Sequence, residues 1–204
     1  MILILSALLF SLSSNLDNLV IGIAYGVKNI KIGTFANLLI AIVTSIGTFL
    51  SMSIGKYISK LLPHYVANSL GAIIIIILGI YFIIQSIIKL MNNTKQKELS
   101  LKDITDMLEY AETSDLDKSG DINIKEASFV ALGLTFNNLG TGIAASITGV
   151  NITFTVAFTF IFSIITIIIG EVFGTHVLGK VLGKYAPLIS GILLIILGIV
   201  EFIN

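Results

Sequence analysis

Six long apolar stretches restrict this chain to a membrane protein built from helices. They cover residues 3–26, 33–55, 66–90, 127–148, 152–174 and 185–203. Each is near or above the roughly 18 apolar residues that can cross a bilayer as a helix. Pro63 and Pro187 are expected in turns before the third and sixth helices, because proline restricts the residue that precedes it. The sequence therefore predicts an all-α, multi-pass protein of the cell membrane with six transmembrane helices, surrounded by the lipid bilayer.

The composition agrees with a membrane protein. Of the 204 residues, 55% are hydrophobic and 12% are charged, and soluble domains carry about 25% charged residues. The first ten residues have no basic segment and no small-residue cleavage site follows, so we expect them to begin a retained helix.

The two halves of the chain resemble each other. Residues 15–19 align with residues 135–139, and Gly22 aligns with Gly142. Because each half holds three helices, the second half must enter the membrane from the opposite side. Inverted repeats of this kind are typical of secondary transporters with a substrate site at the midplane. We expect a first three-helix repeat at 1–91, a polar loop at 92–126 and a second three-helix repeat at 127–204.

The lysine residues indicate the orientation of the chain. Ten of them fall in or beside the connections that follow the first, third and fifth helices, and the opposite side has Lys56 and Lys60. Lysine and arginine are enriched in cytoplasmic loops. We therefore expect the central loop in the cytoplasm and both termini outside.

Polar side chains at bilayer depth indicate a substrate site. Asp17 and Asn18 lie in the middle of the first helix, and Asn137 and Asn138 occupy the matching positions of the fourth. A carboxylate at this depth costs about 3 kcal/mol on insertion scales, so it requires a partner, water or an ion. Carboxylate and amide oxygens suit Mg²⁺, Ca²⁺ and Mn²⁺. These four residues are the predicted transport cation site.

Two further acidic residues lie near helix ends. Glu171, near the end of the fifth helix, is predicted to act as a gate or a coupling group, and an ordinary interfacial glutamate is the equal alternative. Glu201 is near the end of the last helix and is expected at the membrane interface.

Small and hydroxylated side chains recur every three or four residues on four helices. Gly22 and Gly26 on the first helix and Gly142 on the fourth are expected to let helices pack closely. The second and fifth helices carry similar stripes: Asn37, Thr44, Thr48, Ser51 and Gly55, and Thr155, Thr159, Ser163, Thr166, Gly170 and Gly174. Close packing is the simplest interpretation of these stripes as well.

Several function classes are disfavoured. The chain has no cysteine, which excludes disulfides and thiolate metal sites, and all 12 of its basic residues are lysine. The net charge is zero, so nothing indicates a nucleic-acid partner. An intramembrane aspartyl protease needs two carboxylates, but Asn137 stands where the partner of Asp17 would be. We expect no enzymatic activity, and the sequence leaves the oligomeric state undetermined.

The central loop contains a calcium-loop pattern. The residues that match the 12-residue EF-hand loop are Asp115, Asp117, Ser119, Gly120, Asp121, Ile122 and Glu126. Asp121 would contribute its backbone carbonyl, and Gly120 would allow the sharp bend. The pattern predicts Ca²⁺ or another divalent ion, whereas a polar turn capped by these residues is the alternative. A short amphipathic helix is expected earlier in the loop, at Leu101, Ile104 and Leu108.

The two polar motifs, at 14–26 and 137–142, and the insert at 115–127 resemble the putative manganese efflux pump family, most closely its sporulation-associated membrane-protein branch. The resemblance implies a six-helix transporter that exports Mn²⁺, with Asp17 as the motif aspartate of the first helix. It also implies an aspartate in the fourth helix, where this chain has Asn137.

Two hypotheses follow. In the first, the chain exports a divalent cation between inverted halves, with Asp17 and Asn137 as ligands, Asn18 and Asn138 as supports, and Glu171 as a proton-coupling group. In the second, it is a non-transporting membrane protein of spore formation with an ion-responsive cytoplasmic loop.

Overall fold

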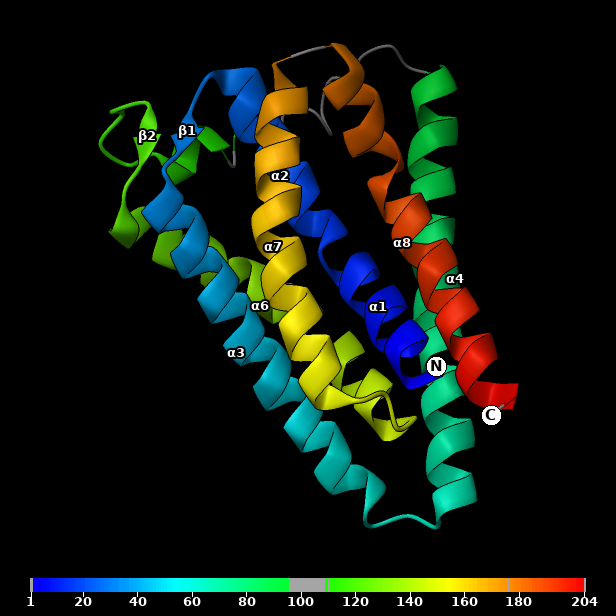
Figure 1. Ribbon diagram of the computed structural model, residues 1–204. Helices are drawn as coiled ribbons and strands as arrows, with labels where there is room; N and C mark the ends of the chain where they lie inside the picture. The colour runs from blue at the N-terminus through cyan, green and yellow to red at the C-terminus, as the bar shows by residue number, and fades with distance from the viewer. Residues whose placement is uncertain (1, 96–108, 110, 176, 204) are drawn as a thin grey trace.

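The chain forms a bundle of long helices (Figure 1), described by a computed structural model for residues 2–95, 109, 111–175 and 177–203. The helices are α1 (Ile2–Ser14), α2 (Leu16–Lys28), α3 (Thr34–Ser59), α4 (His64–Lys95), α6 (Ile124–Ile147), α7 (Ile152–Gly174) and α8 (Val177–Ile203). Two short strands are β1 (Lys31–Ile32) and β2 (Asp121–Ile122). Among the described residues, five spans are long and apolar enough to cross a membrane when α1 and α2 are counted as one span, and the count is six if the two segments of bent α6 also form one span.

Every predicted span coincides with a helix, but two details differ. The first span is divided at Asn15, whose φ of −95° and ψ of 2° separate α1 from α2. Pro63 directly precedes α4, as expected, but the turn predicted at Pro187 is wrong because Pro187 lies inside α8. Transmembrane helices tolerate proline, since neighbouring helices and local adjustments satisfy the backbone groups that it frees. The amphipathic helix predicted at 101–108 lies outside the described residues.

The helices alternate in direction through the bundle (Figure 1). The first span, α4 and α7 run one way, and α3, α6 and α8 run the other way. Both termini lie at one end, and β1 and β2 lie at the opposite end. Large apolar side chains cover much of the outside, as expected for a surface that faces lipid tails.

Glycine lets two pairs of helices approach until their backbones touch. A Cβ atom on Gly22 would lie 2.6 Å from the carbonyl oxygen of Ile167, and one on Gly26 would collide with the carbonyl oxygen of Glu171. At the contact between α3 and α6, a Cβ atom on Gly55 would collide with the carbonyl oxygen of Ile143, and one on Gly142 would collide with the side chain of Ser51. Close approach of this kind is how transmembrane helices associate without a hydrophobic driving force between them.

A parallel pair of strands joins the central loop to the connection between α2 and α3. Lys31 pairs with Asp121 and Ile32 with Ile122, and the Lys31 amide donates to the Gly120 carbonyl at 2.9 Å. Ile122 is buried in a cluster with Ala111 and Ile32. No pattern in the sequence indicated these strands, which attach the end of the loop to the bundle.

Candidate functional site

A small polar pocket lies inside the bundle, where the first span and α6 both depart from straight helices. Its walls come from α1, α2, α3, α6 and α7, and from Asn15 between the first two. The residues that line it are Ser14, Asn15, Asn18, Thr44, Gly47, Thr48, Ser51, Thr135, Asn138 and Thr159. α6 bends by 45° between its segments Ile124–Phe136 and Asn138–Ile147.

Asn18 places a buried amide group in the pocket wall. Its Nδ2 donates to Asn15 Oδ1 at 2.9 Å and to Ser163 Oγ at 2.9 Å. Its side chain is 1% exposed, and Oδ1 has no hydrogen-bond partner within the described part of the chain. A buried oxygen without a partner costs about 1–3 kcal/mol, and a bound cation or water would remove this cost.

Asn138 holds α6 against the first span. Its Nδ2 donates to the Ser14 carbonyl at 3.0 Å and to the Leu134 carbonyl at 3.3 Å. The amide group thereby links the bend in α6 to the end of α1.

The pocket offers only neutral oxygen and amide groups. The space open to the centre of a water molecule is about 10 Å³, which is room for about one water molecule. Hydroxyl, carbonyl and amide oxygens are hard donors that suit Mg²⁺, Ca²⁺ or Mn²⁺. A cation here would need its compensating negative charge from a residue beside the pocket.

Of the predicted cation-site residues, Asn18 and Asn138 line the pocket together. Asp17 does not line it: its side chain is half-buried in the first turn of α2, one residue before Asn18. The side chain of Asn137 lies outside the described part of the chain. The prediction missed Asn15 and Thr135, and it assigned Thr44 and the other stripe residues that line the pocket to close packing.

Glu171 lies at the opposite end of the bundle from the termini. Its half-buried side chain lies against the backbone N–H of Ile32, with Lys31 and Asp121 nearby. It therefore connects α7 to the paired strands.

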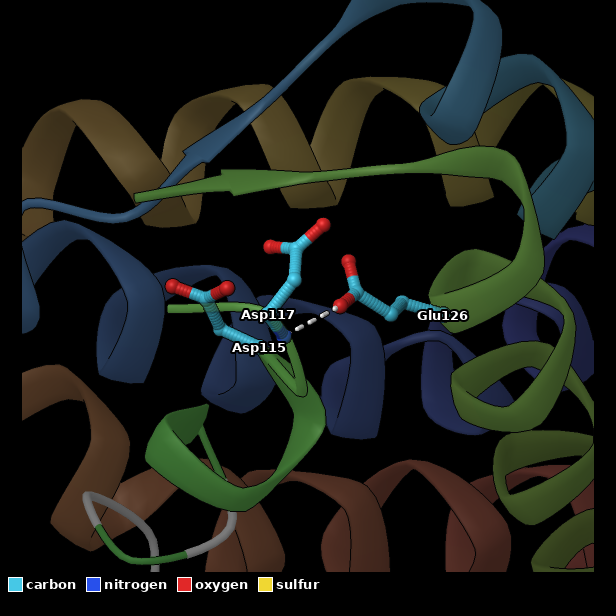
Figure 2. Close-up of side chains that lie close together, drawn as sticks. All are labelled: Asp115, Asp117 and Glu126. Carbon is cyan, nitrogen blue, oxygen red and sulfur yellow. Dashed lines mark hydrogen bonds between the residues drawn. The ribbon is translucent and has the colours of Figure 1, made fainter. Parts of the chain in front are cut away.

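The central loop brings three carboxylates together (Figure 2). Oxygens of Asp115, Asp117 and Glu126 lie within 4.8 Å of one another. Asp115 and Glu126 are 6% and 2% exposed. Hydrogen bonds from Ser119 hold the pKa of the exposed Asp117 below its ordinary value, so this carboxylate is charged at neutral pH.

Backbone amides organise these carboxylates. Asp115 accepts from the amides of Ser119 and Gly120 at 3.0 and 2.9 Å, and Gly120 has the positive φ of 78° that its place in the bend requires. Glu126 Oε1 accepts from the Leu116 amide at 2.7 Å, and its Oε2 accepts from the Asn123 amide at 2.9 Å.

Glu126 also caps the start of α6. The Asn123 side chain accepts from the Glu126 amide at 3.1 Å, which completes a capping box. One carboxylate is thus shared between the acidic cluster and the helix that carries Asn138.

Comparison with known proteins identifies the family. A profile described as "Putative manganese efflux pump" matches residues 2–83 and 98–201. The chain is 32% identical over 157 residues to "Probable sporulation protein YtaF" of Bacillus subtilis (strain 168), covering 71% of this chain and 73% of that protein. No solved structure matches the chain. This multi-pass membrane protein belongs to the putative manganese efflux pump family.

Proposed function

We propose that the chain exports a divalent cation, with Mn²⁺ as the substrate, through the polar pocket between the first span and α6. The observation that carries this proposal is the buried Asn18 Oδ1, which has no hydrogen-bond partner among the described residues and belongs to a pocket of neutral oxygen donors. The family description supports Mn²⁺ as the ion.

Asp17 supplies the negative charge in this proposal. It precedes Asn18 directly and lies in the same broken span as the pocket. Carbonyl groups at the C-terminal end of α1 help to bind the cation. In transporters with discontinuous helices, the C-terminal ends of half-helices coordinate cations in this way. Asn137, which matches Asp17 in the second half, completes the proposed ligand set with Asn138.

We propose alternating access between two inverted three-helix repeats. Support comes from helix contacts that recur in both halves. Gly22 packs against Gly170, and Gly142 packs against Ser51, with each partner 119 or 120 positions from its counterpart. Gly26 with Gly174 and Ser146 with Gly55 form a second matched pair of contacts. The matched spans also run in opposite directions (Figure 1).

Purified protein in liposomes tests the transport function. We expect Mn²⁺ to accumulate in vesicles with the protein and not in protein-free vesicles. Excess unlabelled Mn²⁺ outside the vesicles should inhibit the uptake of labelled Mn²⁺ more strongly than excess Mg²⁺ does. The small pocket requires an ion to lose water, and Mg²⁺ dehydrates reluctantly. Equal Mn²⁺ flux with and without the protein would refute the proposed function.

Single cysteines test the orientation, with the central loop proposed in the cytoplasm. The chain has no cysteine, so Leu116→Cys and Leu61→Cys each create one reactive thiol. These side chains are 63% and 70% exposed, and they lie at opposite ends of the bundle. We expect an impermeant maleimide to label Leu61→Cys in intact cells and Leu116→Cys only after lysis. The reverse pattern would overturn the orientation.

The acidic cluster of the loop favours a second role, binding of Ca²⁺ or Mn²⁺ by Asp115, Asp117, Ser119, Asp121 and Glu126. The specific observation is the convergence of three carboxylates within 4.8 Å. Glu126 Oε1 accepts from the amides of both Leu116 and Asp117, whereas its Oε2 accepts from the Asn123 amide and keeps a further lone pair for an ion. Binding at Glu126 would act on the start of α6, and so on the bend that borders the pocket.

We expect the intact protein to bind Ca²⁺ and Mn²⁺ saturably below millimolar concentration, and Glu126→Gln to weaken this binding. The loss should reach about tenfold or more, because even outer-shell changes cost 10–100-fold in metal affinity. Glutamine can also complete a capping box, so the helix start should survive. Calorimetric titration measures the effect, with Glu112→Gln as the control, since Glu112 pairs with Lys28 outside the cluster. Unchanged affinity in Glu126→Gln would reduce the loop to a capped turn.

The name of the Bacillus relative places that protein in sporulation. Spore formation is a cellular setting that is compatible with cation export. The pocket and the family description favour transport over a non-transporting role.

A further inference from the structure

Glu201 is a buried carboxylic acid at the end of the bundle where the termini lie. Its side chain is 6% exposed, and its interfacial position stays a prediction from the sequence. It belongs to the membrane-spanning part of α8, Tyr185–Ile203. α1 and α4 cover this turn of α8.

Polar groups with unused hydrogen-bonding capacity surround this residue. The Ser6 hydroxyl, on α1, lies beside the Glu201 carboxyl without forming a hydrogen bond of good geometry. The Asn68 side chain, on α4, donates from Nδ2 to the Glu201 carbonyl at 3.2 Å, while its Oδ1 is buried and has no hydrogen-bond partner among the residues that the structure describes.

No described cation neutralises Glu201. α1 has no titratable side chain, and Tyr65, the nearest described titratable group on α4, is 82% exposed. The side chain of His64 lies outside the described residues. Among the described residues, the ion pair joins Lys28 to Glu112, at the end of the bundle opposite to Glu201. A buried carboxylate without a counter-charge is so costly that the group takes a proton instead.

We propose that Glu201 is a proton-binding site that holds a proton in this conformation and releases it when the terminal end of the bundle opens. On release, the O–H bond of the carboxyl breaks, the proton passes to water and the carboxylate remains. The carboxylate needs hydration, so it favours separation of α1, α4 and α8. Proton binding therefore closes this end, and it couples protons to cation export. Only this coupling rests on the proposed function.

The sign of the pH effect follows from this arrangement. The closed conformation binds one more proton than the open one, so rising pH favours the open conformation. The equilibrium can shift by up to about tenfold per pH unit for one proton.

A cysteine at Ala67 reports this opening without a transport assay. Ala67 is 4% exposed and precedes Asn68 on α4. We expect maleimide labelling of Ala67→Cys, corrected for the thiolate fraction, to rise at least about tenfold from about pH 5 to pH 9. It should stay low at every pH in the double variant with Glu201→Gln, which mimics the protonated acid. Glu112→Gln, in the same background, is the matched control and should keep the pH dependence.

Infrared spectroscopy tests the protonation itself. The parent should show a protonated-carboxyl stretch at neutral pH that Glu201→Gln lacks. The proposal is overturned if no such band is lost, if corrected labelling of Ala67→Cys is flat with pH, or if it rises equally with Glu201→Gln. The pH dependence of Ala67→Cys labelling is measured without a Glu201 variant, so this test remains decisive even if Glu201→Gln does not fold.

Transport then separates the two proposals. If the parent moves Mn²⁺ in a way that depends on a pH gradient, Glu201→Gln should lose that dependence. If the parent moves no Mn²⁺ but Ala67→Cys follows pH as expected, the proposed export fails and the proton site stands.

Discussion

Asp17→Asn is expected to reduce Mn²⁺ transport into proteoliposomes by about 100-fold or more. Asp17 is the carboxylate beside a pocket that otherwise offers neutral oxygens. In the variant, the cation in the pocket would lose its counter-charge, and a buried charge without its partner costs about 3–5 kcal/mol. Each 1.36 kcal/mol corresponds to a factor of ten in rate. The initial rate of Mn²⁺ uptake measures the change.

The same variant should remain folded. Asp17 lies in the first turn of α2, where a negative side chain stabilises a helix by about 0.3–1 kcal/mol. Its loss should therefore change thermal stability only slightly. Glu112→Gln removes one carboxylate from the exposed pair with Lys28 and should transport like the parent. Parental uptake by Asp17→Asn would show that the site is assigned wrongly.

Gly26→Ala is expected to destabilise the bundle by about 2–3 kcal/mol, near the upper end of the usual cost of overpacking. The added Cβ atom would collide with the Glu171 carbonyl oxygen and lie 3.0 Å from the Gly174 Cα atom. Both obstacles are backbone, so no side-chain rotation relieves the clash. Thermal unfolding in detergent should shift down by about 5–10 °C, taking 2–4 °C per kcal/mol for a chain of this size.

Gly140→Ala is the matched control for this clash. Gly140 is also within a helix, and a Cβ atom there would meet no atom of the described residues within 4 Å. Alanine favours helix over glycine by about 1 kcal/mol, so this variant should be as stable as the parent or more so. Equal destabilisation by both variants would rule out steric contact as the cause.

The sequence predicted the helices and part of the pocket for physical reasons that can be stated. Twenty consecutive apolar residues in lipid form a helix, because their backbone N–H and C=O groups cannot bond to water there and must bond to each other. Asn18 and Asn138 were identified because amide groups at matched depth in two repeats are costly without a function. Thr44 and Thr48 were assigned to packing, because a hydroxyl stripe looks the same whether it faces a helix or a cavity.

Other features depend on contacts between distant parts of the chain. The burial of Glu201 results from α1 and α4, which no local pattern around residue 201 reveals. The paired strands join Lys31 to Asp121 across 90 positions, and two residues are too few for any periodicity. The continuation of α8 through Pro187 likewise depends on its neighbours and not on the proline itself.

The pairing of β1 with β2 has a consequence for fragments of this chain. In the intact protein, β1 covers the backbone edge of Ile122, the edge that a lone calcium loop usually offers to a second loop. A peptide cut out around residues 111–126 would lose this cover and expose an unsatisfied strand, which is a template for self-association. We expect such a peptide to dimerise through that edge, so that any ion affinity measured on it would describe the dimer and not the loop in its membrane-bound parent.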